Sequence, residues 1–295
     1  MPAEGVKPLA HEEVLSYEDI LYICSILTGL GIKRFKITGG EPLVRHGVCD
    51  FISTLKSLEK VERVTLTTNG LLLAKYMPQL IESGIDGINL SLDTLNRQRY
   101  AEITRHDLLS SALQGLEAAK VLDDFKLKIN CVIMPSASED WLQLAALAKD
   151  HPLAVRFIEH MPLGGMINSQ CTLEDEVKSV LEGAYGRLTL EEQTLGAGPA
   201  VYYRLEGFQG RIGFISALSH KFCRYCNRLR LTSSGFLKTC LQYNAGVNLR
   251  PLLRESSERI TQAIAEAIKN KPAEHFFNKS ELPLREEATM SQIGG

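Results

Sequence analysis

Three cysteines in the last third of the chain have the spacing of metal ligands. Cys223 and Cys226 are separated by two residues, and Cys240 follows in the same segment, FCRYCNRLRLTSSGFLKTCL. A structural zinc closes its tetrahedron with four protein donors, whereas a catalytic metal or an iron–sulfur centre keeps one position open. The trio therefore predicts a centre that does chemistry, although His220 as a fourth ligand would instead make a zinc site.

Two arginines follow the second of these cysteines. Arg228 and Arg230 are two residues apart, so both guanidiniums lie on one side if the stretch is extended. A guanidinium offers planar, forked donors that suit a phosphate or a nucleobase. The pattern predicts an anionic ligand beside the cysteines, with a solvated basic strand as the alternative.

The composition limits the class of protein. The chain has 295 residues, 44% of them hydrophobic, and a formal net charge of −2, so nothing favours a nucleic-acid or membrane partner. An odd total of seven cysteines argues against a disulfide framework. No stretch approaches the ~20 apolar residues of a membrane span, and the first residues do not read as a signal peptide. We expect a cytoplasmic protein.

The elements that must position these residues alternate along the chain up to about residue 160. A helix is predicted to begin after an N-cap at Ser16. Runs typical of strands cover 33–38, 61–69, 87–93, 125–134 and 154–161, and helical periodicity covers 46–58, 74–83, 96–103, 109–122 and 138–149. This order predicts an α/β fold with a parallel sheet, either a barrel or a doubly wound sheet.

Polar residues follow the predicted strands. TGGEP at 38–42, TTNG at 67–70, Ser91 with Asp93, and RFIEHMP at 156–162 stand at strand ends, where parallel α/β proteins place their sites. Glu41 could accept a ligand ammonium or hydroxyl, although an ordinary turn has the same residues. The cations Lys128 and Arg156 lie within strands and need a partner or an anion.

The pattern changes beyond residue 162. Glycines at 164 and 165 precede a helical stretch at 173–183, and 195–200 is rich in Gly and Pro. Short strands are predicted within 201–217, and a strongly amphipathic helix within 255–271. We therefore expect two regions, residues 1–163 and 164–295.

Seven blocks, taken in order, resemble one family. They are TGGEPLVR at 38–45, TTNG at 67–70, SLDTL at 91–95, KINCV at 128–132, RFIEHMP at 156–162, C-x2-C-N-R-L-R at 223–230 and IGG at 293–295. Together they resemble molybdenum cofactor biosynthesis protein A, the GTP 3′,8-cyclase family of the radical S-adenosylmethionine (SAM) superfamily. The resemblance implies an incomplete (β/α)6 barrel, here without its first strand, and a smaller C-terminal region that holds a cluster.

The resemblance also implies an activity, that of a lyase in the first step of molybdenum cofactor biosynthesis. Such enzymes use SAM to convert GTP into 3′,8-cyclo-7,8-dihydro-GTP, with a [4Fe–4S] cluster at each end of the channel. The partners implied are GTP, SAM, an electron donor, the next enzyme (cyclic pyranopterin monophosphate synthase) and a second copy of the chain in a homodimer.

The family's functional positions fall on named residues of this sequence. For SAM they are Gly40, Ser91 and Met161; for GTP they are Lys36, Thr67, Lys128, Arg228, Leu229 and Arg230. The second [4Fe–4S] cluster takes Cys223, Cys226 and Cys240. The catalytic positions are Arg156, near the substrate triphosphate, and Gly294 with Gly295 in a tail that reaches the active site.

The sequence departs from the family in two ways. Lys36 stands where the family often has Arg, so the positive charge is kept and the forked donors of a guanidinium are lost. The family's first strand and C-x3-C-x2-C motif are absent, so SAM and the cluster that cleaves it are expected only in a full-length protein. A gene model without about thirty residues is the interpretation we favour. The alternatives are a non-catalytic relic that binds GTP or a metal, and a zinc-bound interaction module.

Overall fold

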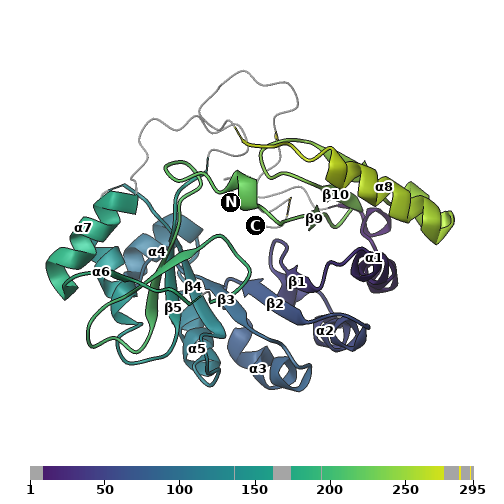
Figure 1. Ribbon diagram of the computed structural model, residues 1–295. Helices are drawn as coiled ribbons and strands as arrows, with labels where there is room; N and C mark the ends of the chain where they lie inside the picture. The colour runs from purple at the N-terminus through teal and green to yellow at the C-terminus, as the bar shows by residue number, and fades with distance from the viewer. Residues whose placement is uncertain are drawn as a thin grey trace.

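A mixed sheet forms the centre of the computed structural model, which describes residues 9–135, 137–161, 174–193, 195–275, 286 and 293 (Figure 1). The strand order within these residues is β1-β2-β3-β4-β5-β8-β7-β6. The parallel strands are β1 (Arg34–Ile37), β2 (Arg63–Thr68), β3 (Ile88–Ser91), β4 (Leu127–Val132), β5 (Ala154–Ile158) and β8 (Arg211–Ile215). Two antiparallel strands, β7 (Val201–Arg204) and β6 (Thr189–Leu190), complete the sheet.

Helices follow the parallel strands in sequence, as expected. They are α1 (Tyr17–Gly29), α2 (Val48–Ser57), α3 (Leu73–Glu82), α4 (Arg97–Thr104), α5 (Leu109–Ala119), α6 (Ser138–Ala146), α7 (Glu174–Tyr185) and α8 (Ser257–Lys269). The predicted N-cap is confirmed, because Ser16 Oγ accepts from the Asp19 amide at 3.1 Å and Asp19 reciprocates. None of the described helices is long and apolar enough to cross a membrane.

The predicted α/β fold and its five parallel strands are confirmed. The short strands predicted within 201–217 are confirmed as β7 and β8, and the structure adds the pairing of β8 with β5, which lies far from it along the chain. The missing first strand and the division at residue 163 stay predictions. Strands β6 to β8, from beyond that division, belong to the same sheet as β1 to β5.

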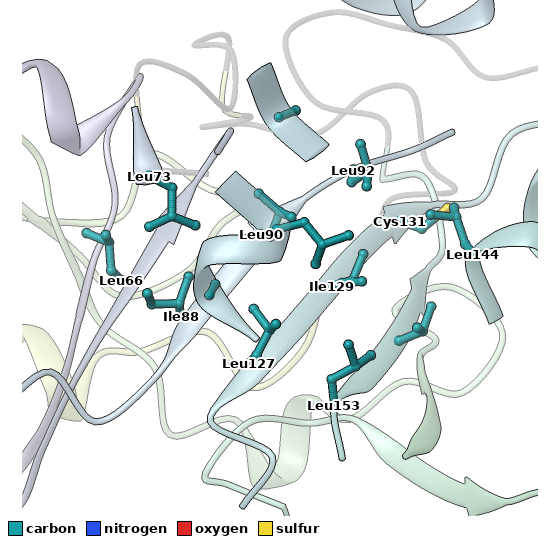
Figure 2. Packing of buried hydrophobic residues seen from close by; sticks show 14 of the residues in the cluster. Leu66, Leu73, Ile88, Leu90, Leu92, Leu127, Ile129, Cys131, Leu144 and Leu153 are labelled. Carbon is teal, nitrogen blue, oxygen red and sulfur yellow. The ribbon is translucent and has the colours of Figure 1, made fainter. Parts of the chain in front are cut away.

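The core lies between one face of the sheet and the helices that cover it. Figure 2 shows leucines and isoleucines of β2, β3 and β4 packed together, among them Leu66, Ile88, Leu90 and Ile129, all fully buried. Burying such a side chain stabilises the fold by about 1.5–3 kcal/mol. Because side chains alternate along a strand, the residues between these leucines and isoleucines must point to the opposite face.

The C-terminal part of the chain packs on α1 rather than on this core. A second cluster joins Ile23 and Leu27 of α1 to Ile260 and Ile264 of α8, and the two helices lie side by side in Figure 1. The cluster also takes in the small sheet of β9 (Arg230–Leu231), β10 (Phe236–Lys238) and β11 (Gly246–Asn248) through Leu237. This packing fixes the cysteine segment relative to β1.

Candidate functional site

Strand register gathers polar side chains on the sheet face opposite the core. Thr67 of β2 pairs with Asn89 of β3, which pairs with Lys128 of β4. One step further along, Asn130 pairs with Arg156 of β5. Side chains at paired positions lie on the same face, so this face is polar and cationic where the other is apolar.

Arg156 is the most buried cation of this face, with only 6% of its surface exposed. Its Nε donates to Asn130 Oδ1 at 2.9 Å and its Nη2 to Asn89 Oδ1 at 2.5 Å. Burial lowers the pKa of Arg156, and a hydrogen bond with Tyr202 opposes this shift. Neutral oxygens thus hold the guanidinium in place without cancelling its charge, which leaves it available to an anion.

Two lysines on the same face have lowered pKa values. Burial, followed by the charges of Arg156, Lys128, Arg228 and Arg230, lowers the pKa of Lys36 to about 7. Water still reaches the Lys36 side chain, so neighbouring positive charge acts on a partly solvated amine.

For Lys128, burial and then Arg156 and Arg63 lower the pKa to about 8. A bound polyanion would reverse both shifts, because it favours the charged form of each amine.

The three predicted cysteines line one pocket, together with Arg228, Arg230 and Met161. Cys223 begins a short 3-10 helix, η3 (Cys223–Tyr225), and Cys240 follows β10. All three are only partly buried. The structure thus places these residues around one pocket, and the site and the roles predicted for them stay predictions.

The surroundings of Cys226 favour its thiolate. Partial burial raises the pKa of this thiol, but hydrogen bonds and charge from Arg228, helped by the charge of Lys271, lower it overall. Lys271 Nζ lies 3.5 Å from Cys226 Sγ and donates to the carbonyls of Cys226 and Arg228, both at 2.8 Å. A thiolate with such donors suits an iron–sulfur cluster, whose sulfur ligands accept hydrogen bonds.

A single-ion site is not formed by these side chains. In the described part of the chain, no group of three or more His, Cys, Asp or Glu side chains is placed to hold one metal ion. His220, the proposed fourth zinc ligand, instead has Nδ1 3.3 Å from a Glu174 oxygen and 3.2 Å from Ser219 Oγ. Because each cysteine of a [4Fe–4S] cluster binds a different iron, three cysteines around an open pocket fit a cluster better than a zinc ion.

The strand-end loops carry the remaining predicted residues. Glu41 ties two of these loops together, because its carboxylate accepts from Thr68 Oγ1 at 2.8 Å, from the Asn69 amide at 2.7 Å and from the Leu43 amide at 3.0 Å. Gly40, the residue before Glu41, and Ser91, the last residue of β3, are exposed. Leu229 packs against the second apolar cluster rather than lining the pocket. Gly294 and Gly295 lie outside the described residues.

Several residues of the site were not identified from the sequence. Asn89, Asn130 and Tyr202 support Arg156, and Lys271 holds the cysteine segment from just beyond the end of α8. Alternation along β3 and β4 carried a signal for Asn89 and Asn130, since each shares its face with Lys128. Nothing in the local sequence marked Tyr202 or Lys271.

Comparisons with known proteins identify the family of the chain. The family described as "Radical SAM superfamily" matches residues 7–148, and the one described as "Molybdenum Cofactor Synthesis C" matches residues 153–277. The chain is 40% identical to the GTP 3′,8-cyclase of Alkaliphilus metalliredigens and 39% identical to that of Petrotoga mobilis, in both cases over all of this chain and 92% of the relative. It is 38% identical to a GTP 3′,8-cyclase of Clostridium perfringens over 97% of this chain and 88% of the relative.

Proposed function

The chain belongs to the GTP 3′,8-cyclase family of radical SAM proteins, which act in molybdenum cofactor biosynthesis, and we propose that it binds GTP along the cationic face of its sheet. The observation that carries this proposal is the convergence of Lys36, Lys128 and Arg156 with Arg228 and Arg230. Arg156, for example, has neutral hydrogen-bond partners in Asn130 and Asn89, and a triphosphate would supply the negative charge that these lack.

The order of these cations gives the nucleotide a direction. Cys226 and Cys240 lie close enough to Arg230 to oppose the lowering of its pKa, so this arginine lies at the cysteine end of the face. The charges of Arg156 and Lys128, and then those of Arg228 and Arg230, lower the pKa of Lys36, so this lysine lies between the two groups, whereas Arg156 and Arg63 lower the pKa of Lys128. We place guanine by the cysteines, where Arg228 and Arg230 offer forked donors to the base, and the phosphates toward Lys128 and Arg156.

Cys223, Cys226 and Cys240 are the residues that would hold a [4Fe–4S] cluster, with one iron free for a ligand atom. Around it, Lys271 keeps the segment from Cys226 to Arg228 in position through its two carbonyl contacts. Gly40, Ser91 and Met161 are the residues assigned to SAM. Of these, Met161 shares a pocket with the cysteines, so that the SAM and GTP sites adjoin there.

The activity proposed is that of a lyase that joins C3′ of the GTP ribose to C8 of guanine. The part of this chain is to orient the nucleotide so that these two carbons face each other. Lys36 and Arg156 fix the phosphate side of the ribose, and Thr67 contacts the sugar or base edge. Gly294 and Gly295, which the family resemblance assigns to catalysis, lie outside the described residues. Fixing the substrate in one conformer is worth a large part of a cyclisation barrier.

The test is GTP binding to the anaerobically reconstituted chain. Replacing Arg228 or Arg230 with Ala is expected to weaken GTP binding about tenfold, because a charge-assisted contact is worth ~1.5–3 kcal/mol, while iron content stays unchanged. Arg97→Ala is the matched control, since Arg97 forms an exposed ion pair with Asp107 away from the site. Loss of iron in the Arg228 and Arg230 variants would show that they support the cluster instead.

A second candidate is a GTP-binding protein without turnover. The 295 residues contain no C-x3-C-x2-C run, the motif that the family resemblance assigns to the SAM-cleaving cluster. Reconstituted chain that binds GTP and about four irons but does not cleave SAM would support this candidate. SAM cleavage by a polypeptide that includes such a run, with formation of the cyclic product, would support the first.

A further inference from the structure

Arg63 lies on the cationic face but has no place in the assignments above. It is the first residue of β2, whose partly buried side chains, Arg63, Thr65 and Thr67, alternate with buried ones, so it shares the face of Thr67. Its guanidinium is half-buried, and in the described residues no carboxylate forms an ion pair with it. The neighbouring Glu62 instead contacts Lys33 and Arg34.

A glycine-rich turn at 195–200, between β6 and β7, lies against this arginine. A methyl group placed on Gly196 would be 3.7 Å from Lys128 Nζ and 4.0 Å from Arg63 Nη1. Gly196 has φ +135°, a conformation that other residues rarely adopt, so this approach of the backbone depends on glycine. The turn thus brings its backbone next to two cations at once.

The same turn also reaches the cysteine segment. Asn227, which stands between Cys226 and Arg228, donates from Nδ2 to the Ala197 carbonyl at 3.5 Å. The turn therefore extends from the Arg63 end of the face to the segment that carries the cysteines. A ligand that filled the face would have this turn as one wall.

Charge accounting shows that this end of the face lacks an anion. Arg63 and Arg156 both lie close enough to Lys128 to lower its pKa, and the described hydrogen bonds and ion pairs give none of the three a carboxylate partner. Like charges held together without counter-ions destabilise the unliganded protein. A phosphate group would remove that repulsion and take forked hydrogen bonds from Arg63.

We propose that Arg63 and the turn at 195–200 form a subsite for the terminal phosphates of the nucleotide. The proposal rests on the GTP site described above and assigns the end of the triphosphate within it. Arg63 adjoins Lys128, toward which the phosphates are placed, because a methyl group on Gly196 would lie 4.0 Å from Arg63 Nη1 and 3.7 Å from Lys128 Nζ. With guanine at the cysteines, the phosphates most distant from the base are the ones that reach Arg63.

The experiment compares nucleotides of different phosphate number on anaerobically reconstituted chain by calorimetry. Arg63→Ala is expected to weaken the binding of GTP about tenfold and to change the affinity for GMP by no more than about twofold, since GMP lacks the phosphates that reach Arg63. Inorganic tripolyphosphate is expected to lose affinity as GTP does. Arg63→Lys, which keeps the charge and loses the fork, is expected to restore part of the loss.

Three results would overturn the proposal. They are an unchanged GTP affinity in Arg63→Ala, an equal loss for GTP and GMP, and an equal loss in Arg97→Ala. Thermal unfolding of each variant separates loss of binding from loss of folding. If GTP binding responds to Arg228→Ala and not to Arg63→Ala, only the subsite fails. If the wild-type chain binds no GTP, the proposed function fails with it.

Discussion

Replacing Lys36 with Arg is predicted to change how GTP binding depends on pH. The pKa of Lys36 is lowered to about 7 in the unliganded protein, by burial and by four neighbouring cations. A bound triphosphate favours the charged amine and raises that pKa. Binding above pH 7 must therefore take up a proton, and GTP affinity must fall as the pH rises.

The size of the effect follows from the fraction of charged lysine. At a pKa of about 7, roughly one Lys36 in ten is charged at pH 8 and one in a hundred at pH 9. If only the charged form bound GTP, affinity would fall about fiftyfold between pH 7, where half of Lys36 is charged, and pH 9. Because water reaches Lys36, we discount this for screening and expect about a tenfold fall, with Lys128 adding to it above pH 8.

Arg stays protonated over this whole range, so Lys36→Arg removes the share of the pH dependence due to Lys36 and leaves the share due to Lys128. The assay is calorimetric titration with GTP in buffers of different ionisation enthalpy, which counts protons taken up on binding. Lys36→Met is the control, with weak binding at every pH. Parallel pH curves for wild type and Lys36→Arg would refute the reasoning.

Three further changes test other parts of the structure. Glu41→Gln is expected to lower the free energy of unfolding in urea by about 1–3 kcal/mol, because it removes a carboxylate that accepts three hydrogen bonds. Glu41→Asp keeps the carboxylate and is expected to lose less. Lys238→Met removes the buried ion pair that Lys238 forms with Glu286 and is expected to cost about 3 kcal/mol, a loss that also changing Glu286 to Leu should largely restore. Arg156→Lys is expected to weaken GTP binding about tenfold at constant iron content, because lysine cannot make the bond to Asn130 together with the bond to Asn89.

The sheet and its helices could be predicted because their signals are local. The buried positions of β2 alternate with polar ones, and Ser16 with Asp19 marks the start of α1 in four residues. The pairing of β8 with β5 could not be predicted, because a long connection separates them and periodicity does not encode partners.

The same distinction between local signals and tertiary packing applies to the candidate site. Cys223, Cys226 and Arg228 are close in sequence, so their proximity to one another was foreseeable. Lys271 and the turn at Gly196 reach the same face through tertiary packing, and no local pattern predicts a lysine that contacts a carbonyl more than forty residues away. Their placement depends on α8 packing against α1 and on the β6–β7 connection folding over the sheet.

The central claim is that the three cysteines hold a cluster next to the GTP that the cationic face binds. It is tested most directly by iron analysis and electron paramagnetic resonance of reduced, anaerobically reconstituted chain, recorded with and without GTP. We predict about four irons per chain and a cluster spectrum that changes on GTP addition, with both the cluster signal and the change lost in Cys226→Ala. One zinc and no iron, or a cluster spectrum that GTP leaves unchanged, would contradict it.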